Sequence, residues 1–172
     1  GCFPIDYTFN PDMKYSEEGA GGLIDMNGNK AEVYDWVKEI NEFFSLIQDD
    51  ILSSDLKGVT SYGEYYNGFT KDEIKDLPDS ECIFTGELPK AFKYTDDGVK
   101  VECENEIMFS VFERNGKPRY YVVNLSSAYK NKVKITLPAG EYEMIRKTAE
   151  STTDGNIELV LDEGEGVYIK GI

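Results

Sequence analysis

The groups in this chain that are best suited to do chemistry are its acidic side chains. The sequence holds 33 aspartates and glutamates and no histidine. Without histidine, Ser-His-Asp and Cys-His nucleophiles, His-ligated zinc and the commonest general base are all excluded. Catalysis would therefore depend on carboxylates, tyrosine or lysine, and two carboxylates about 5–9 Å apart are the pair that cleaves glycosidic bonds.

Three groups of acids invite that interpretation. Asp6 and Asp25 flank the loop after a first extended segment, whereas residues 96–97 and the acidic stretch 162–165 fall in predicted turns. Aspartate is common in turns because its side chain accepts backbone hydrogen bonds, so we interpret the turn acids as structural and assign no catalytic residue. Oxygen ligands at 162–165 suit Ca²⁺, but the spacing of an EF-hand is missing. We expect a solvated turn there, and we predict no metal site and no cofactor.

Aromatic side chains form a second candidate site, for carbohydrate. Tyr62, Tyr65 and Tyr66 cluster in a loop flanked by glycines at 61–68, beside polar groups that suit sugar hydroxyls. Flat aromatic faces can stack against pyranose rings. The alternative, which we favour, is that these tyrosines cover the end of the sheet domain or the helix.

Charge restricts the partners that this chain can bind. Its formal net charge is −15, with 18 basic residues. A nucleic-acid partner is excluded, because binding it requires lysine and arginine to neutralise phosphates, and an anionic membrane is disfavoured for the same reason. No apolar run approaches the roughly 18 residues that span a bilayer, and we expect no signal peptide at the start. The cellular location stays open.

The three cysteines do not form a recognisable site. Cys2, Cys82 and Cys103 are an odd number and lack CxxC spacing, which argues against zinc and against a disulfide framework. Cys82 and Cys103 lie in apolar strand contexts, so we expect buried, reduced thiols.

One long amphipathic helix is predicted at about 30–52. Its apolar residues recur at steps of three and four, which places them on one face; they are Val33, Val37, Ile40, Phe44, Ile47 and Ile51. Trp36 and Phe43 widen this stripe beyond the width of a core line. Because a large exposed apolar patch usually marks an interface, we predict that the helix either docks tightly on the sheet domain or forms a homodimer, with Trp36 and Phe43 at the interface.

From residue 57 the pattern changes to a period of two. Short segments rich in β-branched and aromatic residues alternate with Gly-centred turns about every 10 residues, which predicts an antiparallel β-sandwich. The expected strands are 57–62, 81–86, 90–95, 99–105, 107–114, 119–125, 132–137, 141–148, 156–161 and 166–171. Asp97-Gly98 and Asn115-Gly116 suit tight hairpins, since both members of each dipeptide tolerate positive φ. The fold class is therefore mainly β, a sandwich at 57–172 preceded by one amphipathic helix within 1–56.

Several segments resemble one family. "IDYTF", "GLIDMNGNKAEVYDWVKEINEFFSLI", "IMFSVFERNGKPRYYVVNLSS" and "LDEGEGVYIK" follow one another in the order found at the C-terminal end of a (β/α)8-barrel glycoside hydrolase of the β-galactosidase-like kind. In such enzymes the last barrel strand leads into a loop and a final helix with a Tyr and an Asn, here Tyr34 and Asn41. A small antiparallel sandwich then follows, with Asn124 in a "VVNLS" segment.

The resemblance implies a role without catalysis. A barrel hydrolase of this kind carries its two catalytic carboxylates after the fourth and seventh barrel strands, and only the eighth strand and its helix would be present here. Tyr7 and Phe9 would lie near the sugar site of a complete barrel. The leading hypothesis is a non-catalytic C-terminal accessory module that supports a barrel domain or a partner chain. The alternatives are a stand-alone carbohydrate-binding module that uses Tyr62–Tyr66, and a small glycosidase that uses carboxylates alone.

Overall fold

The computed structural model describes residues 23, 29–63, 65–66, 69–70, 98–126, 128–147 and 149–172. The chain divides into two compact units, Gly1–Ser45 and Leu46–Ile172. The strands expected at 81–86 and 90–95 and the first extended segment lie outside the described residues, as do Cys2 and Cys82.

The amphipathic helix is present as α1 (Glu32–Leu52), close to its predicted bounds. Apolar residues at steps of three and four run through it, and no glycine or proline interrupts it. At its C-terminal end the hydroxyl of Ser54 donates to the carbonyl of Asp50 at 2.6 Å, and the amide of Ser54 donates to the carbonyl of Ile51 at 3.0 Å. These bonds satisfy carbonyls that have no partner inside the helix.

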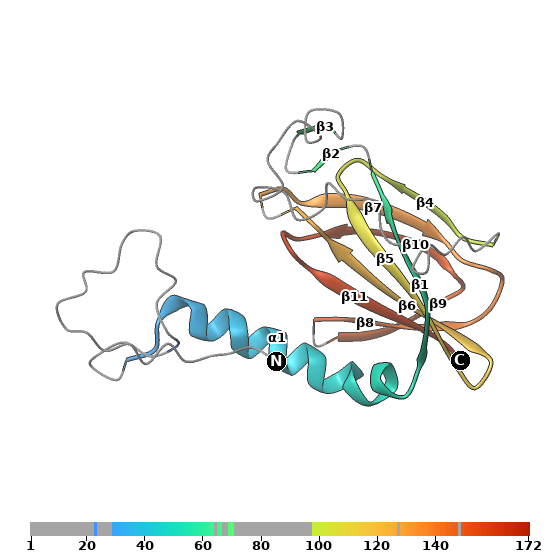
Figure 1. Cartoon of the computed structure of the whole chain (residues 1–172), viewed down its shortest axis with the longest axis horizontal. Helices are drawn as coiled ribbons and strands as arrows, with labels where there is room; N and C mark the ends of the chain where they lie inside the picture. The colour runs from blue at the N-terminus through green and yellow to red at the C-terminus, as the bar shows by residue number, and fades with distance from the viewer. Residues whose placement is uncertain are drawn as a thin grey trace. The chain divides into compact units, whose positions relative to one another are not determined.

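Two antiparallel sheets follow the helix, which confirms the predicted fold class (Figure 1). The larger sheet has the order β1-β5-β6-β11-β8-β9, the smaller sheet has the order β10-β7-β4, and β2 and β3 pair with each other. Their bounds are β1 Asp55–Tyr62, β2 Tyr65–Tyr66, β3 Phe69–Thr70, β4 Lys100–Cys103, β5 Ile107–Arg114, β6 Lys117–Asn124, β7 Asn131–Thr136, β8 Tyr142–Arg146, β9 Ala149–Thr153, β10 Asn156–Leu161 and β11 Gly166–Gly171.

The hairpin between β5 and β6 confirms the predicted Asn-Gly turn. Asn115 and Gly116 have φ values of 54° and 73°, and Arg114 pairs with Lys117 on either side of them. A two-residue turn with positive φ at both positions matches the twist of the strands that it joins. Strand β6 therefore begins two residues before the predicted start at 119.

Strand β9 was not predicted. It forms the edge of the larger sheet beside β8, and four of its five residues are exposed. Because neither face of this strand is fully buried, its sequence "AESTT" has no alternation of apolar and polar residues. The signal that located the other strands is therefore missing from it.

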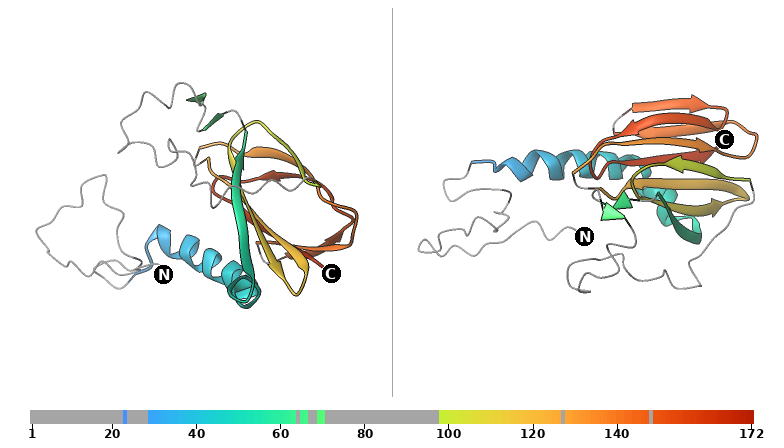
Figure 2. Two further views of the ribbon diagram at one scale, coloured as in Figure 1. Left: turned by 45° about the vertical axis from the view of Figure 1, so that its right-hand side comes forward. Right: turned by 90° about the horizontal axis from the view of Figure 1, so that it is seen from above.

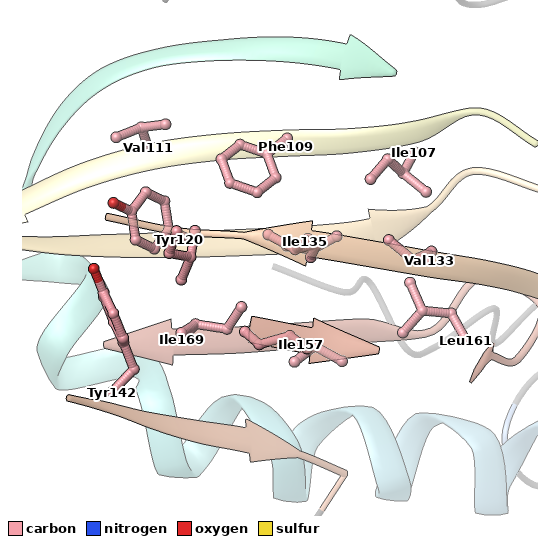
Figure 3. Packing of buried hydrophobic residues seen from close by; sticks show 13 residues of the cluster. Ile107, Phe109, Val111, Tyr120, Val133, Ile135, Tyr142, Ile157, Leu161 and Ile169 are labelled. Carbon is pink, nitrogen blue, oxygen red and sulfur yellow. The ribbon is translucent and has the colours of Figure 1, made fainter. Parts of the chain in front are cut away.

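The core lies between the two sheets, which face each other in Figure 2. Side chains at alternate positions of the strands point into it, as expected for half-buried sheets (Figure 3). Its buried members are Ile107, Phe109, Val111, Tyr120, Val122, Val133, Ile135, Leu137, Tyr142, Ile157, Leu161, Val167 and Ile169. Cys103 packs against this cluster but is only partly buried, whereas a buried side chain was expected.

A second set of buried residues lies on the opposite face of the larger sheet. Arg119, Ile145 and Tyr168 alternate with core residues along their strands, so they point away from the sandwich core. The side chain of Ile47 in α1 is also fully buried and is not part of the core cluster. This face is where the last turns of α1 are attached, as the contacts of Asp50 show.

Candidate functional site

The most connected polar site joins the end of α1 to the outer face of the larger sheet. One carboxylate oxygen of Asp50 accepts from Nη1 of Arg114 at 2.6 Å. Its other oxygen accepts from Nε of Arg119 at 2.6 Å and from the hydroxyl of Tyr168 at 2.8 Å. Side chains from β5, β6 and β11 therefore converge on a single carboxylate of α1.

The groups around this carboxylate are held in place by further contacts. Nη1 of Arg119 donates to the carbonyls of Pro118 and Gly171, both at 3.0 Å. Tyr168 and Arg119 are both buried. Charge-assisted hydrogen bonds of this kind, shielded from water, are stronger than neutral ones. The Asp50 network, meaning Asp50, Arg114, Arg119 and Tyr168, thus fixes the helix end on the sheet.

The electrostatics of the Asp50 network favour one protonation state. Burial raises the pKa of Asp50, but hydrogen bonds from Arg114, Tyr168 and Arg119 outweigh it, so the pKa lies below its usual value. Burial raises the pKa of Tyr168, and the hydrogen bond to the Asp50 anion raises it further. The carboxylate is therefore ionised and the phenol protonated at neutral pH. A general acid would need a raised carboxyl pKa instead.

A second buried ion pair closes the acidic turn between β10 and β11. Arg146 binds Glu165 through both carboxylate oxygens, at 2.8 and 2.9 Å, and the backbone amide of Asp162 donates to Glu165 at 2.7 Å. Burial raises the pKa of Glu165, but the hydrogen bonds from Arg146 and from the amide of Asp162, together with the charges of Arg146 and Lys147, outweigh it, so the net shift is downward. The side chain of Glu165 is 6% exposed. The prediction of a solvated turn is therefore wrong for Glu165, because an arginine that the sequence pattern did not reveal covers it.

Asp162 lies in the same turn between two lysines. Its carboxylate oxygens accept from Lys130 and Lys147, each at 2.8 Å. These two hydrogen bonds lower the pKa of Asp162 to about 2. The oxygens that would have to bind Ca²⁺ are thus already paired with cations. Among the residues that the structure describes, no group of three or more acidic or cysteine side chains is placed to hold a metal ion.

The predicted carbohydrate site falls only partly within the described residues. Tyr62 is partly buried against the core, and its ring meets Phe109 edge-on, with centroids 5.9 Å apart and planes at 89°. The backbone of Tyr65 and Tyr66 forms β2, paired with β3. Tyr7 and Phe9 lie outside the described residues. Tyr62 therefore contributes to the packing of the sandwich, and carbohydrate binding by this loop stays a prediction.

The two aromatic residues predicted at an interface differ in exposure. Trp36 is 58% exposed, whereas Phe43 is buried and meets the ring of Phe44 at a centroid distance of 5.7 Å. Ile40, which belonged to the predicted apolar stripe, is 47% exposed. The exposed apolar row therefore consists of Trp36 and Ile40, continued by Phe44.

Sequence reasoning missed the residues of the Asp50 network. Asp50 follows Ile47 by three positions and precedes Ile51, so it lies at the margin of the apolar stripe. Two features of the sequence could have indicated this network: an acid at that margin, and Arg119 between apolar strand residues. The signal is weak because a stripe margin is also where solvated charges are common.

Comparisons with protein-family models, with curated proteins and with solved structures find no match to this chain. In the part of the chain that is described, no helix is long and apolar enough to cross a membrane.

Proposed function

We propose that this chain is a non-catalytic β-sandwich module that supports a glycoside hydrolase-like domain or partner chain. The observation that carries the proposal is the set of contacts made by three acids, Asp50, Asp162 and Glu165. Asp50, Asp162 and Glu165 are each bound by arginine or lysine, and the pKa of each is lowered. Each of these anions serves as a tie between elements.

A glycosidase needs a different arrangement. One carboxyl group must keep its proton near neutral pH, which requires a raised pKa, and a second carboxylate must stand about 5–9 Å away. Among the described acids with a shifted pKa, namely Asp50, Asp154, Asp162 and Glu165, every shift is downward. This pattern supports an accessory role better than the alternative of a carboxylate-only glycosidase.

The attachment of α1 also supports a structural role. Three side chains from three strands hold Asp50, so the last turns of the helix form one compact unit with the sandwich. A module whose last helical turns are attached to its sheet can present these turns to a neighbouring domain. A freely hinged helix would transmit less stabilisation, because ordering it on binding costs conformational entropy.

Turnover assays test the absence of catalysis. The intact protein is incubated with a panel of nitrophenyl glycosides, and we expect no release of nitrophenol above the buffer rate. Hydrolysis that a single Asp or Glu substitution abolishes would overturn the proposal in favour of the small glycosidase. Glycan-array binding that is lost on combined Tyr65→Ala and Tyr66→Ala substitution would favour the stand-alone carbohydrate-binding module.

The supporting role has its own test. If the same gene or an adjacent gene encodes a glycoside hydrolase-like domain, we expect its thermal midpoint to rise when this module is present. The Asp50→Asn variant should give a smaller rise than the Asp49→Asn control. An unchanged midpoint in the presence of the module would contradict the proposed role.

A further inference from the structure

One side of helix α1 carries an exposed apolar row. Trp36 and Ile40 are 58% and 47% exposed and stand four residues apart, and exposed Phe44 continues the row by another four. Residues at this spacing lie above one another on the same side of a helix. Large side chains exposed singly are common on soluble proteins, but a contiguous row of them is typical of an interaction surface.

Acidic residues line one flank of this row. Asp35, Glu39 and Glu42 are exposed and recur at steps of four and three, so they form a parallel line along the helix. The opposite flank carries the uncharged residues Asn41 and Gln48. The surface thus has a definite polarity across its width, apolar in the middle and anionic on one side.

Among the residues that the structure describes, few cations are placed to neutralise this flank. Within α1 the only basic residue is Lys38, which approaches Glu42 at 3.5 Å. Both side chains of this pair are about half exposed, so the pair is weak. In the described part of the chain, this flank therefore has more acidic than basic side chains.

We infer that this side of α1 binds a partner polypeptide that presents an apolar groove with lysine or arginine along one rim. Trp36 and Ile40 would fill the groove, and Asp35, Glu39 and Glu42 would face the basic rim. Charges beside an apolar seam select partner and orientation in helix pairing. The inference rests on the proposed accessory role, since it names the chemistry by which such a module recognises its neighbour.

A second copy of this chain fits the surface poorly. In an antiparallel helix pair like flanks meet, which would set the acidic line of one copy against that of the other. In a parallel pair the acidic line would meet the uncharged flank with Asn41 and Gln48. Neither arrangement supplies cations to the acids, and each copy carries a net charge of −15.

A lipid surface fits poorly as well. Helices that lie in a membrane interface carry lysine and arginine on their polar face, which attract anionic headgroups. Apart from Asp50, which is bound to the sheet, α1 contains five acidic residues and one basic residue, so its polar residues are mainly acidic. Anionic lipid would repel it.

Trp36 makes the inference directly testable, because it is the sole tryptophan of the chain. Protein labelled with 5-fluorotryptophan gives one fluorine resonance from this position. Two synthetic amphipathic helical peptides serve as probes, with identical leucine faces and with either lysine or glutamate flanks. We expect the lysine peptide to shift the resonance and to bind at least about tenfold more tightly than the glutamate peptide, with an affinity that falls as salt is raised.

Charge reversal on the flank provides the variant. Combined Glu39→Lys and Glu42→Lys substitution should reverse the peptide preference. The matched control is combined Glu104→Lys and Glu150→Lys substitution at two exposed acids outside the helix, which changes the net charge equally and should leave the preference intact. Circular dichroism confirms that both variants are folded.

Three results would overturn the inference. They are equal affinity for the two peptides, a resonance that shifts with protein concentration in the absence of peptide, and a shift that appears with phosphatidylcholine–phosphatidylserine vesicles but with neither peptide. The second result would identify a homodimer and the third a membrane surface. None of them bears on the turnover assay, so failure of this inference and failure of the proposed function are distinguishable.

Discussion

The two parts of helix α1 carry the same apolar stripe, but its residues are exposed in one part and buried in the other. Ile40 and Ile47 are seven residues apart on one side of the helix, yet Ile40 is 47% exposed and Ile47 is fully buried. Trp36 accompanies the exposed part, whereas Asp50 and its partners accompany the buried part. An apolar stripe therefore predicts that a helix forms, but it does not predict which length of the helix is covered.

The Asp50 network explains the difference at the buried end. Removing a carboxylate from water costs free energy unless hydrogen bonds replace its hydration. Arg114, Arg119 and Tyr168 provide three such bonds on one sheet face. Ile47, three residues before Asp50, is fully buried in the part of the helix that this polar contact attaches to the sheet.

Removing the polar tie should have the largest effect. We expect Asp50→Ala to lower the free energy of unfolding by about 3 kcal/mol, because it removes the carboxylate that accepts from Nε of Arg119 and from the hydroxyl of Tyr168, both of which are buried residues. Urea titration followed by circular dichroism measures the loss. Asp49→Ala, one residue away and exposed, should change stability by less than about 0.5 kcal/mol. Equal losses of stability for Asp50→Ala and Asp49→Ala would contradict the role of the Asp50 network in attaching the helix end.

Truncating the two isoleucines compares the two parts of α1 with the same chemistry. Ile47→Ala should cost about 2–4 kcal/mol, since it leaves a cavity at a fully buried site. Ile40→Ala should cost less than about 0.5 kcal/mol, because an exposed side chain loses little and alanine favours the helix. The same urea titrations measure both. A large loss for Ile40→Ala would mean that the exposed row is buried in solution.

Low pH should reduce the contribution of Asp50 to the stability of the protein. Folding lowers the pKa of Asp50, so its contribution is complete above the unfolded-state pKa of about 3.9 and is lost as the pH falls through the lower folded value. We expect the stability difference between the original protein and Asp50→Asn to shrink steadily from pH 5 to pH 2. A difference that is constant over this range would show that the pKa of Asp50 is not lowered.

The smallest effect on stability is expected for the two ion pairs of Asp162 with Lys130 and Lys147, in the turn between β10 and β11. The pKa of Asp162 should be about 2 by carbon-detected NMR titration, and Lys130→Ala or Lys147→Ala should each raise it toward its ordinary value. Neither variant should change the urea midpoint measurably, because exposed ion pairs contribute little to stability. Glu165→Gln serves as the comparison, since it disrupts a pair whose carboxylate is buried. A lower midpoint for the lysine variants than for Glu165→Gln would contradict this ranking.

The sequence by itself determined the elements whose signals are local. Apolar residues at steps of three and four specify α1, alternation specifies strands such as β5 and β7, and Asn115-Gly116 specifies a hairpin, because each pattern acts over a few neighbouring residues.

The tertiary structure alone decided the outcomes that depend on distant partners. Asp50 meets Tyr168, which is 118 positions away in the chain, and β9 forms because β8 offers it an edge to pair with. Burial and ionic contact between remote segments are properties of the folded arrangement, and no local periodicity encodes them.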